Sequence, residues 1–312
     1  MKNAILGTDL SAASDRIIEN STEFKLFGIT RIILVYVLNL RSTMDFAEYN
    51  LNSAQNKLDY QKKRLLSFDF EVDTKIVMGV PAIELMRQVK INDAELVIIG
   101  SRGNSWSKST LGETASEVLH NIKCPVLLMA FNKGQEEQEL MESIQEDLHH
   151  FEKFISQFRK QEPKIELMHR NLNQHVLLTT DFSDFSENAF QWLKNQLAPV
   201  PRLTLMHIQD VVRIKHLEHK LEEFNQIDEA RLERLKEDFS GLHPETEIKN
   251  VLAYGNPKQL ISQYIRDSKA TLTVMGSQGR GYISEFFLGS VSLRVARQAD
   301  SNVLIIPFNR QL

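Results

Sequence analysis

Glycines and serines gather at one place in the second half of the sequence, in a spacing suited to holding an anion. Gly276-Ser-Gln-Gly279 is followed by nine residues, 280–288, and then by Gly289-Ser290. The apolar run 271–275 before this segment predicts a buried strand, and 291–299 after it predicts a helix. Glycine lets backbone approach a ligand closely, and free N–H groups at a helix start attract phosphate. The segment predicts a phosphate-binding loop, with a flexible turn as the alternative.

Other side chains belong to the same predicted site because parallel strands end at one edge of a sheet. Asp181 follows a strand predicted at 176–180, and Ile208 lies near the end of another at 202–210. Ligands of such sheets bind beyond the carboxyl ends of the strands. An ionised Asp181 would accept hydrogen bonds from ribose hydroxyls, while Ile208 and Met275 would offer an apolar slot for a flat base. Together these residues predict a nucleotide pocket.

Several familiar motifs are missing. The sequence contains no G-x-x-x-x-G-K-[ST] loop, no dinucleotide fingerprint in a first strand–helix turn and no G-x-S-x-G nucleophile elbow. We therefore predict no catalytic residues. His216 and His219 are three residues apart, but a solvated helix face explains them better than a metal site, and we predict no metal ligands. His207 either lines the pocket or has a structural role.

Composition excludes several protein classes. The net charge is −4 and 25% of residues are charged, which gives no reason to expect nucleic acid or an anionic membrane as a partner. The N-terminal residues lead almost directly into a predicted strand, so we expect no signal peptide and a cytoplasmic location. The single cysteine, Cys124, excludes an intrachain disulfide and is predicted to be a small buried hydrophobic residue.

The chain repeats itself once. Residues 4–21 resemble 176–193, and the matching order continues to the end, with Asp9 and Asp181 172 positions apart. Strand-like apolar runs alternate with helical patterns in each half, which favours parallel strands buried on both faces. The predicted fold class is α/β, with two tandem Rossmann-like or flavodoxin-like domains, each a five-stranded, mainly parallel sheet flanked by helices.

The predicted domain boundaries follow the repeat. We assign 1–132 to a first domain with a degenerate loop, 133–172 to a helical connection, and 173–312 to a second domain with an intact loop. Apolar residues at helical spacing from Leu140 to Phe158 predict an amphipathic helix in the connection. The segment after Pro163 is predicted to be extended.

On these residues the sequence resembles the universal stress protein family, in a tandem form with two domains in one chain. The spacing G-x-x-G, nine residues, then G-[S/T] is that of the family's nucleotide-binding branch, and the second half matches it fully. The resemblance implies that the binding residues are those of the second-half loop and of the three strand ends beside it: Thr179, Asp181, Ile208, Met275, Gly276, Gly279, Arg280, Gly289, Ser290 and Val291.

Each of these residues has an implied place. The resemblance puts Asp181 beside ribose and adenine, Ile208 and Met275 against adenine, and the glycines with Ser290 and Val291 on the phosphates. Thr179 is a departure, because members of the branch often have proline there. Arg280 reaches either the phosphates or solvent.

The first half departs further from the pattern. Eight residues instead of nine separate Gly103 from Gly112, and Glu113 stands where Ser290 stands in the second half. A carboxylate there would repel phosphate. Thr114 and Glu117 also match a capping box, which would satisfy the amides of the helix internally. We expect this half to bind nucleotide weakly or not at all.

The resemblance implies a cytoplasmic stress-response protein that binds ATP, ADP or AMP, with or without Mg²⁺, in its second half and acts as a sensor or regulator. A slow ATPase and a nucleotide-independent interaction protein, or a binder of another small ligand, are the alternatives. Family members pair through their last strands, so 124–131 and 301–308 are expected to lie edge to edge. The chain would then act as its own dimer, with further homodimerisation left open.

Overall fold

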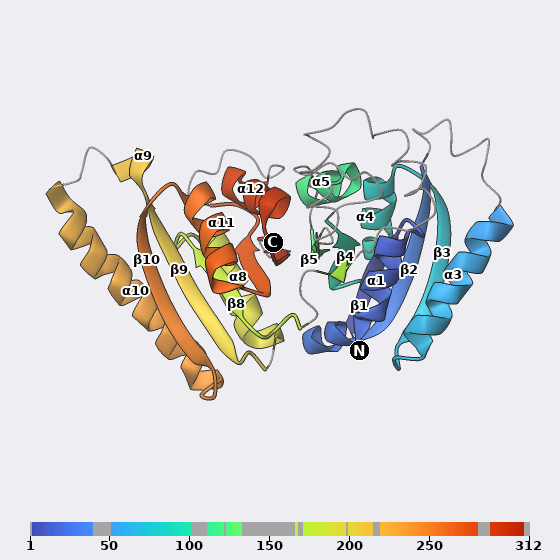
Figure 1. Cartoon of the computed structure of the whole chain (residues 1–312), viewed down its shortest axis with the longest axis horizontal. Helices are drawn as coiled ribbons and strands as arrows, with labels where there is room; N and C mark the ends of the chain where they lie inside the picture. The colour runs from blue at the N-terminus through green and yellow to red at the C-terminus, as the bar shows by residue number, and fades with distance from the viewer. Residues whose placement is uncertain are drawn as a thin grey trace, which may run out of the picture.

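The computed structural model describes residues 2–39, 51–101, 111–121, 123–132, 166–167, 171–197, 199–214, 219–279 and 288–308. The two halves lie side by side, as Figure 1 shows, and their main strands form one sheet. Most of the predicted helical connection and Arg280 lie outside the described residues. At the two ends of this connection, the short strands β6 (Phe131–Asn132) and β7 (Glu166–Leu167) pair with each other. The segment after Pro163 is therefore extended where it is described.

The first half contains five parallel strands in the order β5-β4-β1-β2-β3. They are β1 (Lys2–Thr8), β2 (Ile29–Asn39), β3 (Glu71–Gly79), β4 (Leu96–Gly100) and β5 (Val126–Met129). The helices described between them are α1 (Ala12–Glu19), the 3₁₀ helix η1 (Ser21–Phe27), α3 (Leu51–Leu66), α4 (Pro81–Asn92) and α5 (Glu113–His120).

The second half repeats this order as β12-β11-β8-β9-β10. Its strands are β8 (Val176–Thr180), β9 (Arg202–Asp210), β10 (Glu247–Gly255), β11 (Leu272–Gly276) and β12 (Asn302–Ile306). Its described helices are α8 (Asp184–Gln196), α9 (Val211–Ile214), α10 (Leu221–Leu242), α11 (Pro257–Ser268) and α12 (Ser290–Gln298). The predicted α/β class with two five-stranded units is confirmed.

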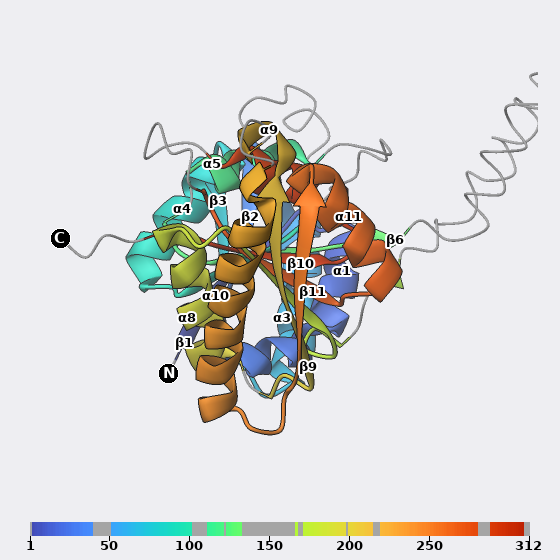
Figure 2. The same ribbon diagram turned by 90° about the vertical axis from the view of Figure 1, so that its left-hand side faces the viewer.

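The strands are apolar on both sides because helices cover both faces of the sheet. One hydrophobic core lies between one face of the sheet and the helices α1, α3, α8 and α10. A second core lies between the opposite face and the helices α4, α5, α11 and α12. Along β9 the two cores alternate: Leu203 and Leu205 enter the first, while Met206 and Ile208 enter the second. The turned view in Figure 2 shows α10 running along β9 and β10.

The last strands of the two halves join edge to edge, as expected. β12 pairs antiparallel with β5, with Leu304 opposite Leu127. The fully buried Asn302 strengthens this junction, because its Oδ1 accepts a hydrogen bond from the Ala130 N–H (2.9 Å) and its Nδ2 donates to the Thr271 carbonyl (3.1 Å). A buried amide bonded on both sides fixes the register in which the halves meet.

Candidate functional site

The strand order reverses between β8 and β11, which is where open α/β sheets bind ligands. These two strands are direct neighbours, with Val274 opposite Leu178. The loops that follow them, which begin at Asp181 and Ser277, therefore lie next to each other at the carboxyl edge of the sheet. This topology joins residues almost 100 positions apart in the sequence.

Asp181 and Gly279 are in close contact. A Cβ atom built on Gly279 would lie 2.5 Å from Oδ2 of Asp181, a separation that real side chains do not reach. The other carboxylate oxygen, Oδ1, accepts hydrogen bonds from the Ser183 N–H (3.1 Å) and hydroxyl (2.5 Å), and Ser183 in turn caps α8. Only glycine permits this approach of the loop to the carboxylate.

Gly276 and Gly289 hold the two ends of the loop. A Cβ on Gly276 would lie 2.7 Å from the Phe185 carbonyl oxygen. The Gly289 N–H donates to the Ser277 carbonyl at 2.7 Å, and the Ser292 hydroxyl donates to the Gly276 carbonyl at 2.9 Å. The start of α12 is thereby fixed against the end of β11.

The first residues of α12 face the same edge of the sheet. Gly289 stands at the cap position and has no side chain that could satisfy the first amides of the helix. Ser290 is exposed at the first helical position, and Val291 is half-buried beside it. An uncapped helix start is a place where backbone N–H groups can bind an anion.

Apolar residues form the floor below this edge. Ile208 (8% exposed) and Met275 (4%) belong to the same core, and Thr179 is buried in β8 opposite Met206 of β9. The structure therefore brings together all of the site residues predicted in the second half except Arg280, which lies outside its described part.

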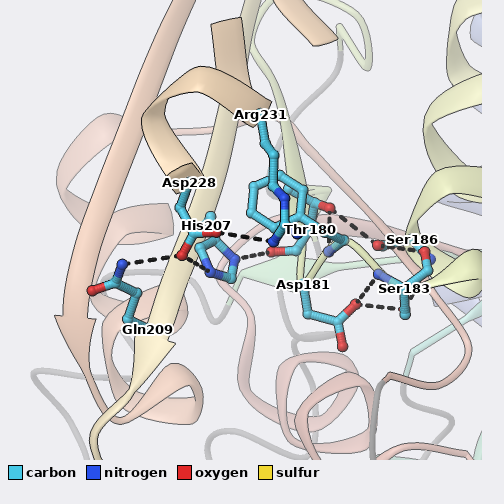
Figure 3. Close-up of polar contacts among 9 residues, drawn as sticks. Thr180, Asp181, Ser183, Ser186, His207, Gln209, Asp228 and Arg231 are labelled. Atoms are coloured by element: carbon cyan, nitrogen blue, oxygen red, sulfur yellow. Dashed lines mark hydrogen bonds and ion pairs between the residues drawn. The ribbon is translucent and has the colours of Figure 1, made fainter. Parts of the chain in front are cut away.

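A buried polar cluster beside the site was not predicted. Asp228 of α10 contacts His207, Gln209 and Arg231, and His207 reaches back to the Thr180 carbonyl (Figure 3). The sequence offered one signal for it: Asp228 occupies an inward position of an amphipathic helix, where charge is rare.

The matching loop of the first half is arranged differently. Oδ1 of the exposed Asp9 accepts hydrogen bonds from the Ser11 N–H (3.1 Å), the Ser11 hydroxyl and the Ser14 hydroxyl (2.6 Å). Helix α5 begins at Glu113 with Gly112 at its cap. The predicted capping box is therefore wrong, because Thr114 lies inside the first turn. Glu113 itself brings the negative charge that a helix start favours.

The remaining candidates play no part in the site. Cys124 is buried, as predicted, and this burial raises the pKa of its thiol to about 12, which makes the residue unreactive. Among the described residues no group of three or more His, Cys, Asp or Glu side chains could hold a metal ion; His216 lies outside them. The helices in the described ranges include none with the length and apolar character of a membrane span.

Comparison with known proteins agrees with the two-fold repeat. The model of the universal stress protein family matches residues 1–129 and 173–307. A universal stress protein of Mycobacterium tuberculosis is 22% identical over 318 residues, which is 98% of this chain and 96% of that protein. One from Methanocaldococcus jannaschii is 26% identical over 150 residues, 42% of this chain and 93% of its own length.

A solved structure shows the same fold over the full length. The crystal structure of a universal stress protein from Archaeoglobus fulgidus superposes with a TM-score of 0.64 at 20% identity, and the match covers 98% of each chain. Together with the family model, which spans most of both halves, this agreement identifies the chain as a member of the universal stress protein family.

Proposed function

We propose that this protein binds an adenine nucleotide in its second half and acts as a cytoplasmic sensor or regulator in a stress response. The observation that carries the proposal is the contact between Asp181 and Gly279, with the uncapped start of α12 at the far end of the same loop. A carboxylate is suited to binding ribose hydroxyls, and a loop whose backbone comes close to the ligand is suited to the chain of phosphates. A helix start is suited to the last phosphate.

The residues present fit such a ligand. Asp181 Oδ2 would accept hydrogen bonds from ribose hydroxyls, while Oδ1 stays bonded to Ser183. Ile208 and Met275 are large apolar side chains near the ends of β9 and β11, the strands on either side of β8, and would contact the base. Backbone N–H groups of the loop from Gly276 to Gly279, and of Gly289, Ser290 and Val291, would hold the phosphates. We also propose that Arg280 takes part and that Mg²⁺ accompanies the phosphates.

We further propose that the junction of the halves replaces a dimer contact. β5 and β12 pair as two single-domain chains would pair through their last strands. A chain built in this way supplies both partners of the assembly itself. Equilibrium sedimentation would then give a monomer mass, and a dimer mass would show that chains associate further.

The ligand itself provides the test. The protein is purified, denatured, and the released nucleotide is identified by mass; the nucleotide-free protein is then titrated with ATP, ADP and AMP by calorimetry. We expect binding that Gly289→Glu abolishes, because the new carboxylate would stand at the start of α12. Gly241→Ala, at a position in α10 with nothing within 4 Å, serves as the control and should bind normally.

Two results would overturn the proposal. One is the absence of any nucleotide, together with no calorimetric binding, which would favour a nucleotide-independent interaction protein. The other is steady release of phosphate from ATP that Asp181→Ala abolishes, which would favour an enzyme over a sensor.

A further inference from the structure

Three polar side chains are buried between β9 and α10. His207 and Gln209 are each 5% exposed, and Asp228 is 8% exposed. Asp228 joins them: its Oδ2 accepts a hydrogen bond from Gln209 Nε2 (3.0 Å) and lies 3.4 Å from His207 Nε2, while its Oδ1 accepts one from Arg231 at 3.2 Å (Figure 3). Each of these three neighbours therefore has a nitrogen directed at a carboxylate oxygen.

Both ring nitrogens of His207 face acceptors. Nδ1 lies 2.7 Å from the Thr180 carbonyl oxygen, which can only accept, and Nε2 faces the Asp228 carboxylate. A neutral imidazole has one N–H and would leave one of these acceptors facing a lone pair. The imidazolium, with two N–H donors, satisfies both. The contacts therefore favour a protonated ring.

His175, also buried, shows the opposite arrangement. Its Nδ1 faces the Ser268 carbonyl (3.1 Å), but its Nε2 faces the Thr204 hydroxyl (3.0 Å), which can donate. A neutral ring satisfies both contacts, and burial lowers the pKa of His175. Two buried histidines in one domain therefore require different charge states.

The protonated ring is connected to the residues on either side of Asp181. Thr180, whose carbonyl it binds, precedes Asp181, and Phe182 follows it. Phe182 has a left-handed backbone (φ 57°). The centroid of its ring lies 4.5 Å from the centroid of the His207 imidazole and 5.3 Å from the central carbon of the Arg231 guanidinium. A bulky residue adopts this conformation only where its surroundings hold it. The imidazole and the guanidinium pack against this ring, so the cluster contacts the loop directly.

We propose that His207 is a positioning residue for the nucleotide site, and that its protonated ring links α10 to the Asp181 loop. The inference rests on the proposed function, since it concerns the affinity of that same site. As pH rises and the ring loses its proton, the bond to Asp228 is lost, Thr180 and Phe182 are held less firmly, and Asp181 is less well placed to accept from ribose.

The groups around the ring are consistent with one titrating link. From α10 it faces the Asp228 carboxylate, which the Arg231 guanidinium also contacts; from β8 it faces the neutral Thr180 carbonyl. Asp181 turns its carboxylate toward Ser183, away from the ring (Figure 3). The positive charge of Arg231 opposes a charge on His207, whereas the Asp228 carboxylate, 3.4 Å from Nε2 of the ring, favours it.

Among its described residues the first half has no such link. Aligning the buried pair Leu58 and Leu65 of α3 with Leu232 and Phe239 of α10 places Ala54 at the position of Asp228. Tyr36 stands at the position of His207. Instead, Gln61 of α3 accepts a hydrogen bond from the Thr8 hydroxyl (2.9 Å), a neutral contact that pH does not change.

The test compares ATP affinity between about pH 5.5 and pH 8.5, where an ordinary histidine titrates. Wild type and His207→Gln are titrated under identical conditions, so that the titration of the phosphates, which is common to both, cancels in the ratio of their affinities. We expect the affinity of wild type relative to His207→Gln to fall about fivefold toward high pH. This is the size expected when one charge-assisted contact is partly lost. His243→Gln, a histidine of the same half that contacts the Lys194 carbonyl, is the matched control and should keep the wild-type dependence.

A second variant covers the case in which His207→Gln does not fold. Asp228→Asn keeps the shape of the side chain but removes the charge that favours the imidazolium, so the midpoint of the pH dependence should move to lower pH. Hydrogen exchange of the peptide that contains residues 177–186, measured without nucleotide, should show the same pH step in wild type and lose it in His207→Gln.

The outcomes separate this inference from the proposed function. ATP binding with the same pH dependence in wild type and His207→Gln, or an unmoved midpoint in Asp228→Asn, would overturn the inference and leave the function intact. No ATP binding at any pH would overturn the proposed function, and the hydrogen-exchange measurement alone would then test the link between His207 and the Asp181 loop. A pH step in exchange that is lost in His207→Gln supports this link, and an unchanged step refutes it.

Discussion

The two halves of this protein hold the same aspartate in the same turn, but they bind it differently. In the first half the Ser14 hydroxyl donates to the Asp9 carboxylate at 2.6 Å, in addition to two donors from Ser11. In the second half the matching Ser186 hydroxyl donates to the Ser183 carbonyl at 2.9 Å, and Asp181 Oδ2 faces Gly279. One carboxylate closes its own loop, whereas the other is directed toward a neighbouring loop.

This difference shows that the fold does not depend on how the aspartate is bonded. Both halves have the same strand order, and both have a left-handed residue after the aspartate, Leu10 or Phe182. The turn is therefore a property of the fold. What separates the halves is the chemistry around the turn: the direction of a serine hydroxyl, the residue at the helix start, and the cluster beneath it.

The largest expected effect comes from exchanging the residues at the helix starts. Ser290→Glu places in the second half the residue that Glu113 provides in the first. The carboxylate would repel the phosphates by roughly 3 kcal/mol at an effective dielectric constant of about 20, so ATP affinity should fall about a hundredfold. Calorimetry measures it, and Ser290→Ala, with a loss of about tenfold or less, separates charge from the missing hydroxyl.

The reverse exchange sharpens the comparison. Glu113→Ser should create no new site, because the loop before it remains one residue shorter than in the second half. Binding of a second nucleotide by this variant would show that the glutamate alone disables the first half.

A smaller loss of affinity is expected from a single methyl group. Gly279→Ala would bring Cβ to within 2.5 Å of Asp181 Oδ2 and must displace the carboxylate or the loop. ATP affinity should fall about tenfold, the loss of one charge-assisted hydrogen bond. Gly241→Ala, in the last turn of α10, should leave binding unchanged and raise stability by at most about 0.5 kcal/mol. Equal affinities for the two variants would contradict the account of the site.

The two aspartates should separate stability from binding. Asp9→Ala removes an acceptor from three donors of its own loop and should destabilise the fold by about 1 kcal/mol, with ATP affinity unchanged. Asp181→Ala should weaken ATP binding as well. Urea unfolding monitored by circular dichroism measures the first effect and calorimetry the second. A loss of ATP affinity in Asp9→Ala would place a nucleotide in the first half.

The smallest effect is a pH dependence of stability that His175 contributes. Because burial lowers its pKa in the folded protein, the unfolded chain binds more protons below the usual histidine pKa of 6.5. This contribution is fully present above that value and is lost as the pH falls below it. His175→Asn removes the titrating group and should reduce the loss of stability between about pH 7 and pH 5. Asparagine should fit this position, because Asn3 occupies the matching position in the first half and donates to the Asn92 carbonyl in the same way. An unchanged slope would contradict this.

Much of the fold was predictable from the sequence because its signals are local and occur twice. Apolar runs such as 96–100 and 272–276 predicted the buried strands, and the repeat predicted two similar domains. Pro81 and Pro257 open α4 and α11, as prolines at a first helical position do. The edge-to-edge strands came from the family resemblance, since no local pattern reports which edges meet.

The site was predictable only as a set of residues. Spacing identified Gly276, Gly279 and Gly289, but not that Gly279 touches Asp181, because that contact depends on how the two loops fold. The capping-box prediction at Thr114 failed because the helix starts one residue before it. The cluster of His207 and Asp228 was missed because it joins a strand to a helix 21 residues later. Its inward position on an amphipathic helix, and the repeat with Ala54 at the matching position, could have marked Asp228 as unusual.

The central claim is that one half binds nucleotide and the other does not, and the number of ATP molecules bound per chain tests it most directly. Calorimetric titration of nucleotide-free protein should give one site per chain in wild type and in Glu113→Ser, and one site weakened about a hundredfold in Ser290→Glu. Two sites per chain, or a site that keeps its wild-type affinity in Ser290→Glu, would contradict this claim, because the first half would then bind the ligand.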